Sequence, residues 1–213
     1  MTNQHSFIVL GTGGRFTYQV IQTLINNNHL PIAYVQFGKN PEQKLTTFSN
    51  IELEIKKPES LLSELLKNHN IPIYYQSQIK IDQFLKKNNA EYLLVACWPK
   101  LIGDKVLKAV SKAALNLHPS LLPDFRGIDP ISDQIKKRNY NFGISLHLIS
   151  DTYDTGDIVL QQSLNKNINR DKTNIETETA VKGAELFVKA VHTFETPGWT
   201  LVSQYKNQEL KSS

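Results

Sequence analysis

The fold class of this chain of 213 residues is indicated by the segment Phe7-Ile8-Val9-Leu10-Gly11-Thr12-Gly13-Gly14. Four consecutive apolar residues stopped by a glycine-rich turn are typical of a strand that is buried on both faces. A pattern with helical spacing follows over residues 16–25. A buried strand, a tight turn and an amphipathic helix in this order predict the first unit of an α/β domain.

Strand-like and helical patterns alternate outward from this unit. We expect further strands over residues 31–37, 71–75, 92–96, 113–117, 142–149 and 158–164. We expect further helices over residues 58–66, 79–87, 106–110 and 180–194. The predicted fold is therefore α/β, with a mostly parallel, Rossmann-like sheet and helices on both faces. In such sheets ligands bind beyond the carboxyl ends of the strands.

The patterns predict one domain over residues 1–205, followed by a polar tail at 206–213. Residues 38–57 are expected to include a loop, Pro197-Gly198 to end the last helix, and residues 199–205 to add a last strand. The chain carries a net charge of +4 and a single cysteine, Cys97, which we interpret as a small buried hydrophobe. The absence of a signal peptide, of a membrane-spanning run and of any internal disulfide favours a cytoplasmic protein. The oligomeric state stays open, and a homo-oligomer is compatible with the sequence.

The turn formed by Gly11, Thr12, Gly13, Gly14 and Arg15 is the first candidate binding site. Backbone N–H groups at a helix start can hold a phosphate, and an arginine can assist. A plain tight turn is the alternative. A nicotinamide or flavin site is disfavoured, because Phe16 stands where the dinucleotide fingerprint needs glycine.

The segment Asn116-Leu117-His118-Pro119-Ser120-Leu121-Leu122-Pro123 carries more information. Asn116 and His118 are two residues apart at the end of a predicted strand, so their side chains point to the same side. One is an amide donor, and the other can donate, accept or carry charge. Downstream, Asp154-Thr155-Gly156-Asp157 lies between two predicted strands and becomes relevant if the fold brings Asp154 to His118.

These two segments, at this spacing, resemble the signature of the folate-dependent formyltransferases, and the resemblance extends from about Ile8 to Phe194. It implies a catalytic domain that uses 10-formyltetrahydrofolate as co-substrate and no metal. It places the catalytic roles on Asn116, His118 and Asp154. It also implies a folate site made by Trp98, Pro99, Lys100, Leu101, Ile102, Ser150, Asp151, Thr152 and Tyr153.

The resemblance leaves the amine acceptor open. Arg126-Gly127 and Pro130 resemble the tRNA and sugar enzymes, whereas the length resembles glycinamide ribonucleotide transformylase. We expect a small, phosphorylated or nucleotide-linked amine, such as an amino sugar, bound by the Gly11–Arg15 turn and Arg126. Methionyl-tRNA and glycinamide ribonucleotide are the alternative acceptors. A nucleic-acid or membrane partner is not expected.

Two other interpretations concern binding without turnover and the remaining histidines. A non-catalytic folate- or nucleotide-binding module is the alternative of another class, and Asn116, His118 and Asp154 together argue against it because binding alone needs no base. We interpret the other histidines as structural: His5, His29, His69, His147 and His192.

Overall fold

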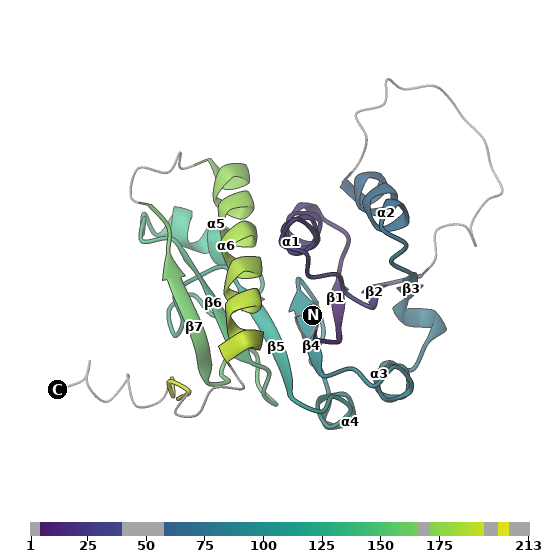
Figure 1. Ribbon diagram of the computed structural model, residues 1–213. Coiled ribbons are helices and arrows are strands. Elements are labelled where there is room, and N and C mark those ends of the chain that lie inside the picture. The colour runs from purple at the N-terminus through teal and green to yellow at the C-terminus, as the bar shows by residue number, and fades with distance from the viewer. Residues whose placement is uncertain (1–4, 40–57, 166–170, 194–199, 205–213) are drawn as a thin grey trace, which may run out of the picture.

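The computed structural model describes residues 5–39, 58–165, 171–193 and 200–204. Its centre is a seven-stranded sheet in the order β3-β2-β1-β4-β5-β6-β7 (Figure 1). The strands are β1 (Phe7–Gly11), β2 (Ala33–Gln36), β3 (Ile73–Tyr75), β4 (Tyr92–Ala96), β5 (Ala113–His118), β6 (Gly143–Leu148) and β7 (Ile158–Ser163). The helices are α1 (Arg15–Asn26), α2 (Pro58–Asn68), η2 (Gln76–Gln78, a 3₁₀ turn), α3 (Ile81–Lys87), α4 (Asp104–Leu107), α5 (Pro130–Lys136) and α6 (Lys172–Thr193).

The sheet is parallel from β3 through β5. Strand β6 runs antiparallel to β5, and β7 runs antiparallel to β6. The prediction of a mostly parallel α/β sheet is therefore confirmed. The antiparallel end was not predicted, because local patterns set where a strand lies but not the direction in which it pairs.

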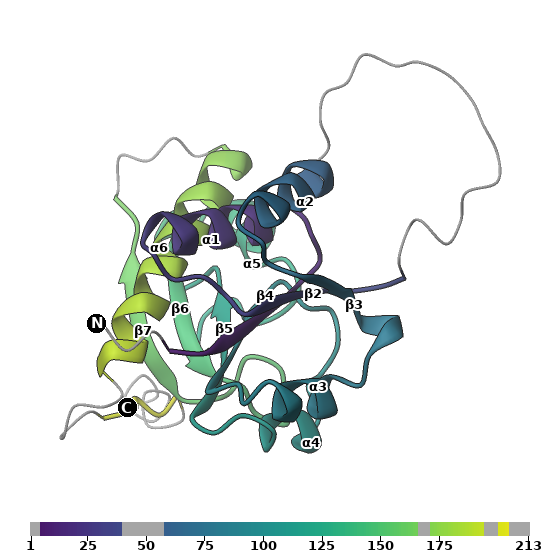
Figure 2. The same cartoon turned by 45° about the vertical axis from the view of Figure 1, so that its right-hand side comes forward.

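Helices cover both faces of the sheet, as Figures 1 and 2 show. Side chains alternate along β1, so that Phe7 and Val9 join the core beneath α1, α2 and α6, whereas Ile8 and Leu10 join the core with α3 and α4. This arrangement explains the unbroken apolar run of β1, since neither face of the strand meets water.

The same alternation on β5 prepares a polar edge. Leu115 and Leu117 are buried in the core under α6. Asn116 and His118 consequently point to the opposite face, at the carboxyl end of the strand.

Helix α5 was not predicted from the sequence. It has seven residues and begins at Pro130, after Asp129, whose side chain accepts a hydrogen bond from the backbone N–H of Ser132 at 3.3 Å. The sequence Asp-Pro is a recognised helix start, but the helix is too short for its apolar periodicity to be read.

Several expectations for the C-terminal part are only partly within the described residues. Val202 forms a single antiparallel bridge with Ile158 rather than a strand. Pro197-Gly198, the tail at 206–213 and residues 40–57 lie outside the described residues.

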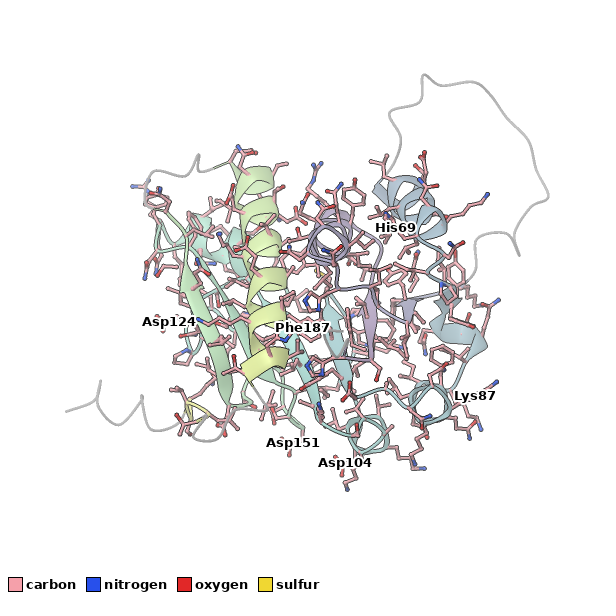
Figure 3. All side chains as sticks on the ribbon, viewed as in Figure 1. His69, Lys87, Asp104, Asp124, Asp151 and Phe187 are labelled. Carbon is pink, nitrogen blue, oxygen red and sulfur yellow. The ribbon has the colours of Figure 1, made fainter. Side chains whose placement is uncertain are left out.

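Phe187 anchors α6 to the sheet and provides a test of this core. Its ring is fully buried and lies 5.0 Å from the ring of Phe7 (Figure 3). Because truncation leaves a cavity, Phe187→Ala should lower the free energy of unfolding by about 3–5 kcal/mol, measured by urea titration. Lys189→Ala, on the exposed side of the same helix, should change it by less than about 0.5 kcal/mol. Equal losses in the two variants would show that α6 does not pack as described.

Candidate active site

The pairing of β5 with β6 brings polar residues of the two strands side by side at the carboxyl end of β5. Asn116 lies directly opposite His147 in the antiparallel register, and His118 lies opposite Ser145. His118 and His147 are almost fully buried, at 3% and 2% exposure. Buried imidazoles need hydrogen-bond partners, and the β6–β7 loop supplies the shared one.

That shared partner is the carboxylate of Asp154. Its Oδ1 lies 3.4 Å from His118 Nδ1 and 3.6 Å from His147 Nε2. The same oxygen accepts a hydrogen bond of 3.4 Å from Asn116 Nδ2, and Oδ2 accepts one of 3.0 Å from the backbone N–H of Gly127. The structure thus brings the three predicted catalytic residues together, with His147 added to them.

The backbone of the β6–β7 loop is shaped to deliver this carboxylate. Asp154 has a left-handed φ of 54°, an uncommon conformation that aspartate tolerates better than most residues. Two residues on, Gly156 passes so close to the backbone of Leu148 that a side chain would collide with the Leu148 carbonyl oxygen. The glycine of Asp154-Thr155-Gly156 is therefore required by close backbone approach.

The environment holds Asp154 in its ionised form. Burial alone would raise the pKa of this carboxyl group, but the hydrogen bonds from His118 and His147, the charge of His118 and the Gly127 N–H outweigh it. The net result is a pKa well below the ordinary value of an aspartate. Asp154 consequently remains a carboxylate at any physiological pH.

Hydrogen bonds also fix the two imidazoles. His118 Nε2 lies 2.8 Å from the carbonyl oxygen of Phe125, and His147 Nδ1 lies 2.7 Å from that of Leu148. A carbonyl can only accept, so each of these nitrogens carries a proton. Asn116 Nδ2 is 3.0 Å from His147 Nε2, and the same ring nitrogen lies 3.6 Å from Asp154 Oδ1. His147 thereby orients the amide of Asn116.

A cavity of about 400 Å³, counting its open mouth, adjoins this polar cluster. Its lining includes Asn116, His147 and Asp154, and most residues of the predicted folate site: Trp98, Lys100, Leu101, Ile102, Ser150, Thr152 and Tyr153. Val95 and Ile149 complete it. Among the described residues of the two segments, Pro99 and Asp151 are exposed and stand outside this lining; Asp151 is labelled in Figure 3.

The Gly11–Arg15 turn lies at the carboxyl end of β1. Gly13 has a φ of 83°, Gly14 caps α1, and Thr12 and Arg15 are exposed. A side chain at Gly11 would collide with Thr17, so part of this glycine pattern serves close packing of α1 on the sheet. The turn is not among the residues that line the cavity.

Arg126, a predicted acceptor-binding residue, has a protein partner. Its Nε and Nη2 donate to Gln204 Oε1 at 3.2 and 2.7 Å. A glutamine 78 residues away in the sequence thus engages one edge of the guanidinium, a contact that the sequence offered no signal to predict.

The structure adds to one sequence interpretation and contradicts another. His147, which we interpret as structural, also lines the cavity and contacts Asn116, a position that depends on its antiparallel pairing with Asn116. The interpretation of Cys97 as buried is wrong: the residue is exposed, because the chain turns out of β4 there with a φ of 67°. The four remaining histidines, His5, His29, His69 and His192, are not among the residues that line the cavity.

The part of the chain that the structure describes contains neither a metal-binding cluster nor a membrane-spanning helix. No three histidine, cysteine, aspartate or glutamate side chains within 5–39, 58–165, 171–193 and 200–204 are arranged to hold a metal ion. None of the helices in this part of the chain combines the length and apolarity needed to cross a membrane.

The lowered pKa of Asp154 predicts an acid-dependent contribution to stability. A carboxyl group whose pKa is depressed by folding stabilises the folded state above its unfolded pKa, here about 3.8, and loses that contribution as the pH falls below it. The difference in unfolding free energy between wild type and Asp154→Asn should therefore be constant above about pH 5 and change steadily below pH 3.8, with wild type losing stability relative to the variant. Urea titrations from pH 2.5 to 7 measure it, with Asp151→Asn on the same loop as control. A difference independent of pH would contradict the ion pairing of Asp154.

Comparison with known proteins shows the family of this chain. A family model described as formyl transferase matches residues 7–191. Methionyl-tRNA formyltransferase of Helicobacter pylori strain ATCC 700392 / 26695 is 28% identical over 194 residues, covering 89% of this chain and 60% of the relative. The corresponding enzyme of Sulfurihydrogenibium sp. is 25% identical over 187 residues, covering 84% and 56%. The chain thus spans about 60% of the length of these curated relatives.

Solved structures share the fold at low sequence identity. Phosphoribosylglycinamide formyltransferase of Streptococcus pneumoniae TIGR4 aligns with a TM-score of 0.67 and 16% identity, covering 90% of this chain and 99% of its own. An N-formyltransferase of Helicobacter canadensis, in complex with folinic acid and dTDP-3-aminofucose, aligns with a TM-score of 0.65 and 16% identity, covering 94% and 67%. Because the family model covers most of the sequence, the chain belongs to the formyl transferase family of enzymes.

Proposed function

We propose that the chain transfers the formyl group of 10-formyltetrahydrofolate to the amine of a small phosphorylated or nucleotide-linked acceptor. One observation carries the proposal: an ionised, largely buried Asp154 contacts both Asn116 and His118, and Asn116 and Asp154 line a largely apolar cavity. Positioned amide and imidazole donors beside a carboxylate are what acyl transfer to an amine needs.

Asn116 and His118 stabilise the negative charge that develops on the formyl oxygen. The bond from Asn116 Nδ2 to Asp154 is long, at 3.4 Å, so this N–H can turn to the oxyanion at little cost. Both ring nitrogens of His118 have partners, and donation to the oxyanion exchanges the bond with the Phe125 carbonyl for one with the substrate. Asp154 Oδ1 lies 3.4 Å from His118 Nδ1 and so holds the ring in position while this charge develops.

Asp154 also receives the proton that the amine must lose, through a water molecule. A carboxylate with so low a pKa is a weak base toward a free ammonium ion. Once the carbon–nitrogen bond has formed, however, the attacking nitrogen is positively charged and strongly acidic. A weak base that is ionised beforehand and lies at the right place is sufficient at that stage. The proton taken from the attacking nitrogen is then available to N10 of tetrahydrofolate, which leaves as its bond to the formyl carbon breaks and the formyl carbonyl re-forms.

The cavity takes the pteridine of the folate. Trp98, Leu101 and Tyr153 provide apolar and aromatic walls, and Asn116 and Asp154 add polar groups to the lining. Ligand sites of this kind bind flat heterocycles between apolar walls with a few polar contacts. The folinic acid named for the Helicobacter canadensis neighbour supports a reduced folate as the co-substrate.

The acceptor binds next to the folate, at the Gly11–Arg15 turn. The turn follows the neighbouring strand β1 and opens α1, whose N-terminal N–H groups and dipole attract an anion. Arg15 is exposed beside it, and the N–H groups of Arg126 that Gln204 does not engage are the second candidate donors. The dTDP-linked amino sugar named for the neighbour is an acceptor of this class.

Methionyl-tRNA is the second candidate acceptor, and the curated relatives named above favour it because both are methionyl-tRNA formyltransferases. The two candidates separate in one assay. The chain is mixed with 10-formyltetrahydrofolate and a panel of acceptors: nucleotide-linked amino sugars, glycinamide ribonucleotide and charged initiator tRNA. Released tetrahydrofolate reports which of them is formylated.

His118→Ala should lower kcat in this assay by about 10²–10³-fold, because it removes an oxyanion donor. The dissociation constant for 5-formyltetrahydrofolate should change by less than about fivefold, since His118 is not among the residues that line the cavity. His69→Ala, which replaces a histidine at the end of α2, serves as the matched control. Wild-type turnover in His118→Ala would remove this residue from the mechanism.

Arg15→Ala should weaken binding of a phosphorylated acceptor by about 1.5–3 kcal/mol, because a charge-assisted hydrogen bond is lost. Acceptor KM and kcat are compared with those of wild type and of Arg15→Lys, which retains the charge but loses the planar fork. If all three proteins share the same KM and kcat, the Gly11–Arg15 turn does not hold the phosphate.

A further inference from the structure

Gln204 is a fully buried polar side chain that the proposed mechanism does not use. It belongs to residues 200–204, which run beside β7 through two backbone hydrogen bonds of 2.9 Å between Val202 and Ile158. Its exposure is 0%. Burial of an amide is costly unless its donors and acceptor are all used, so its contacts merit a function.

The amide of Gln204 joins the two loops that form the active site. Its Nε2 donates to the carbonyl oxygens of Asp154 and Gly156 at 3.1 and 2.6 Å. Its Oε1 accepts from Nε and Nη2 of Arg126 at 3.2 and 2.7 Å. Both N–H groups and the oxygen are thereby occupied, one side by the β6–β7 loop and the other by the β5–α5 loop.

These contacts form a closed circuit of hydrogen bonds that includes Asp154. Arg126 is followed by Gly127, whose N–H donates to Asp154 Oδ2 at 3.0 Å. Gln204 then returns from Arg126 to the backbone of Asp154 itself. Asp154 has an uncommon left-handed φ, and this circuit holds both its carboxylate and its backbone carbonyl in place.

We propose that Gln204 is a positioning residue: it holds the Asp154 backbone and the Arg126–Gly127 segment in register, and so aims the Asp154 carboxylate at His118. The inference rests on the proposed function for its kinetic consequence. An amide is needed, because one side must donate to two carbonyls while the other accepts from a guanidinium. Neither a carboxylate nor an apolar side chain of the same length meets both demands.

Two substitutions separate positioning from simple anchoring of the segment. Gln204→Met keeps the length and removes every hydrogen bond. Gln204→Glu keeps the acceptor for Arg126 but places an oxygen against the carbonyls of Asp154 and Gly156. Thr200→Ala, exposed on the same segment, is the matched control.

Each variant is measured in two ways. Kinetics with the acceptor identified above give kcat per active site, counted by titration with 5-formyltetrahydrofolate so that unfolded protein does not contribute. Imidazole ¹⁵N shifts of protein labelled in histidine, with His118 assigned by its absence in His118→Ala, report whether Asp154 still faces His118.

We expect kcat to fall by about 10–100-fold in both Gln204 variants, because small displacements of a catalytic group are costly. We expect the His118 ¹⁵N shifts to move in both, and Thr200→Ala to match wild type in both measurements. Unchanged kcat per active site and unchanged shifts in Gln204→Met would overturn the proposal. If Gln204→Glu matches wild type in kcat per active site and in the His118 shifts, the contacts of Gln204 with Asp154 and Gly156 do not position the carboxylate. If wild type formylates no acceptor, the proposed function fails, while the ¹⁵N shifts still decide whether Gln204 positions Asp154.

Discussion

The contacts of the Asp154 carboxylate with its polar neighbours hold this site together. It is surrounded by polar groups from three segments: Asn116 and His118 on β5, His147 on β6 and Gly127 on the loop after β5. An ionised group with little access to solvent is stable only when such partners compensate its lost hydration. The charge therefore acts as the centre that fixes how the two loops approach the sheet.

The arrangement of the strands is what makes this centre accessible to one short loop. Because β6 runs antiparallel to β5, His147 stands directly opposite Asn116, and the β6–β7 loop emerges near the amide that it must reach. Gly156 lets that loop turn tightly against Leu148, and Gln204 holds it from the other side. The largely apolar cavity is bordered on one side by this polar cluster, since Asn116, His147 and Asp154 belong to its lining.

The sequence predicted those features whose cause is local. The strands β1 and β4 follow from unbroken apolar runs, and the common orientation of Asn116 and His118 follows from alternation along β5. The gathering of Asn116, His118 and Asp154 rested on resemblance to a known family, because no local rule brings residue 154 to residue 118. The same holds for the cavity lining, where the match is close but not complete, since Pro99 and Asp151 point elsewhere. His147 and Gln204 could not be found this way: one depends on the antiparallel register and the other on a contact made by the far end of the chain. Helix α5 is too short for a periodic pattern, and strand direction is set by pairing rather than by composition.

The most direct test is a crystal structure of the chain with 5-formyltetrahydrofolate, which resembles the formyl donor but carries its formyl group on a different nitrogen. We expect the pteridine to lie between residues 98–102 and 149–154, with its formyl-bearing edge next to Asn116 and His118. We also expect Asp154 to face His118 in the complex. A folate bound elsewhere on the molecule, or an Asp154 turned away from His118 in the complex, would contradict it.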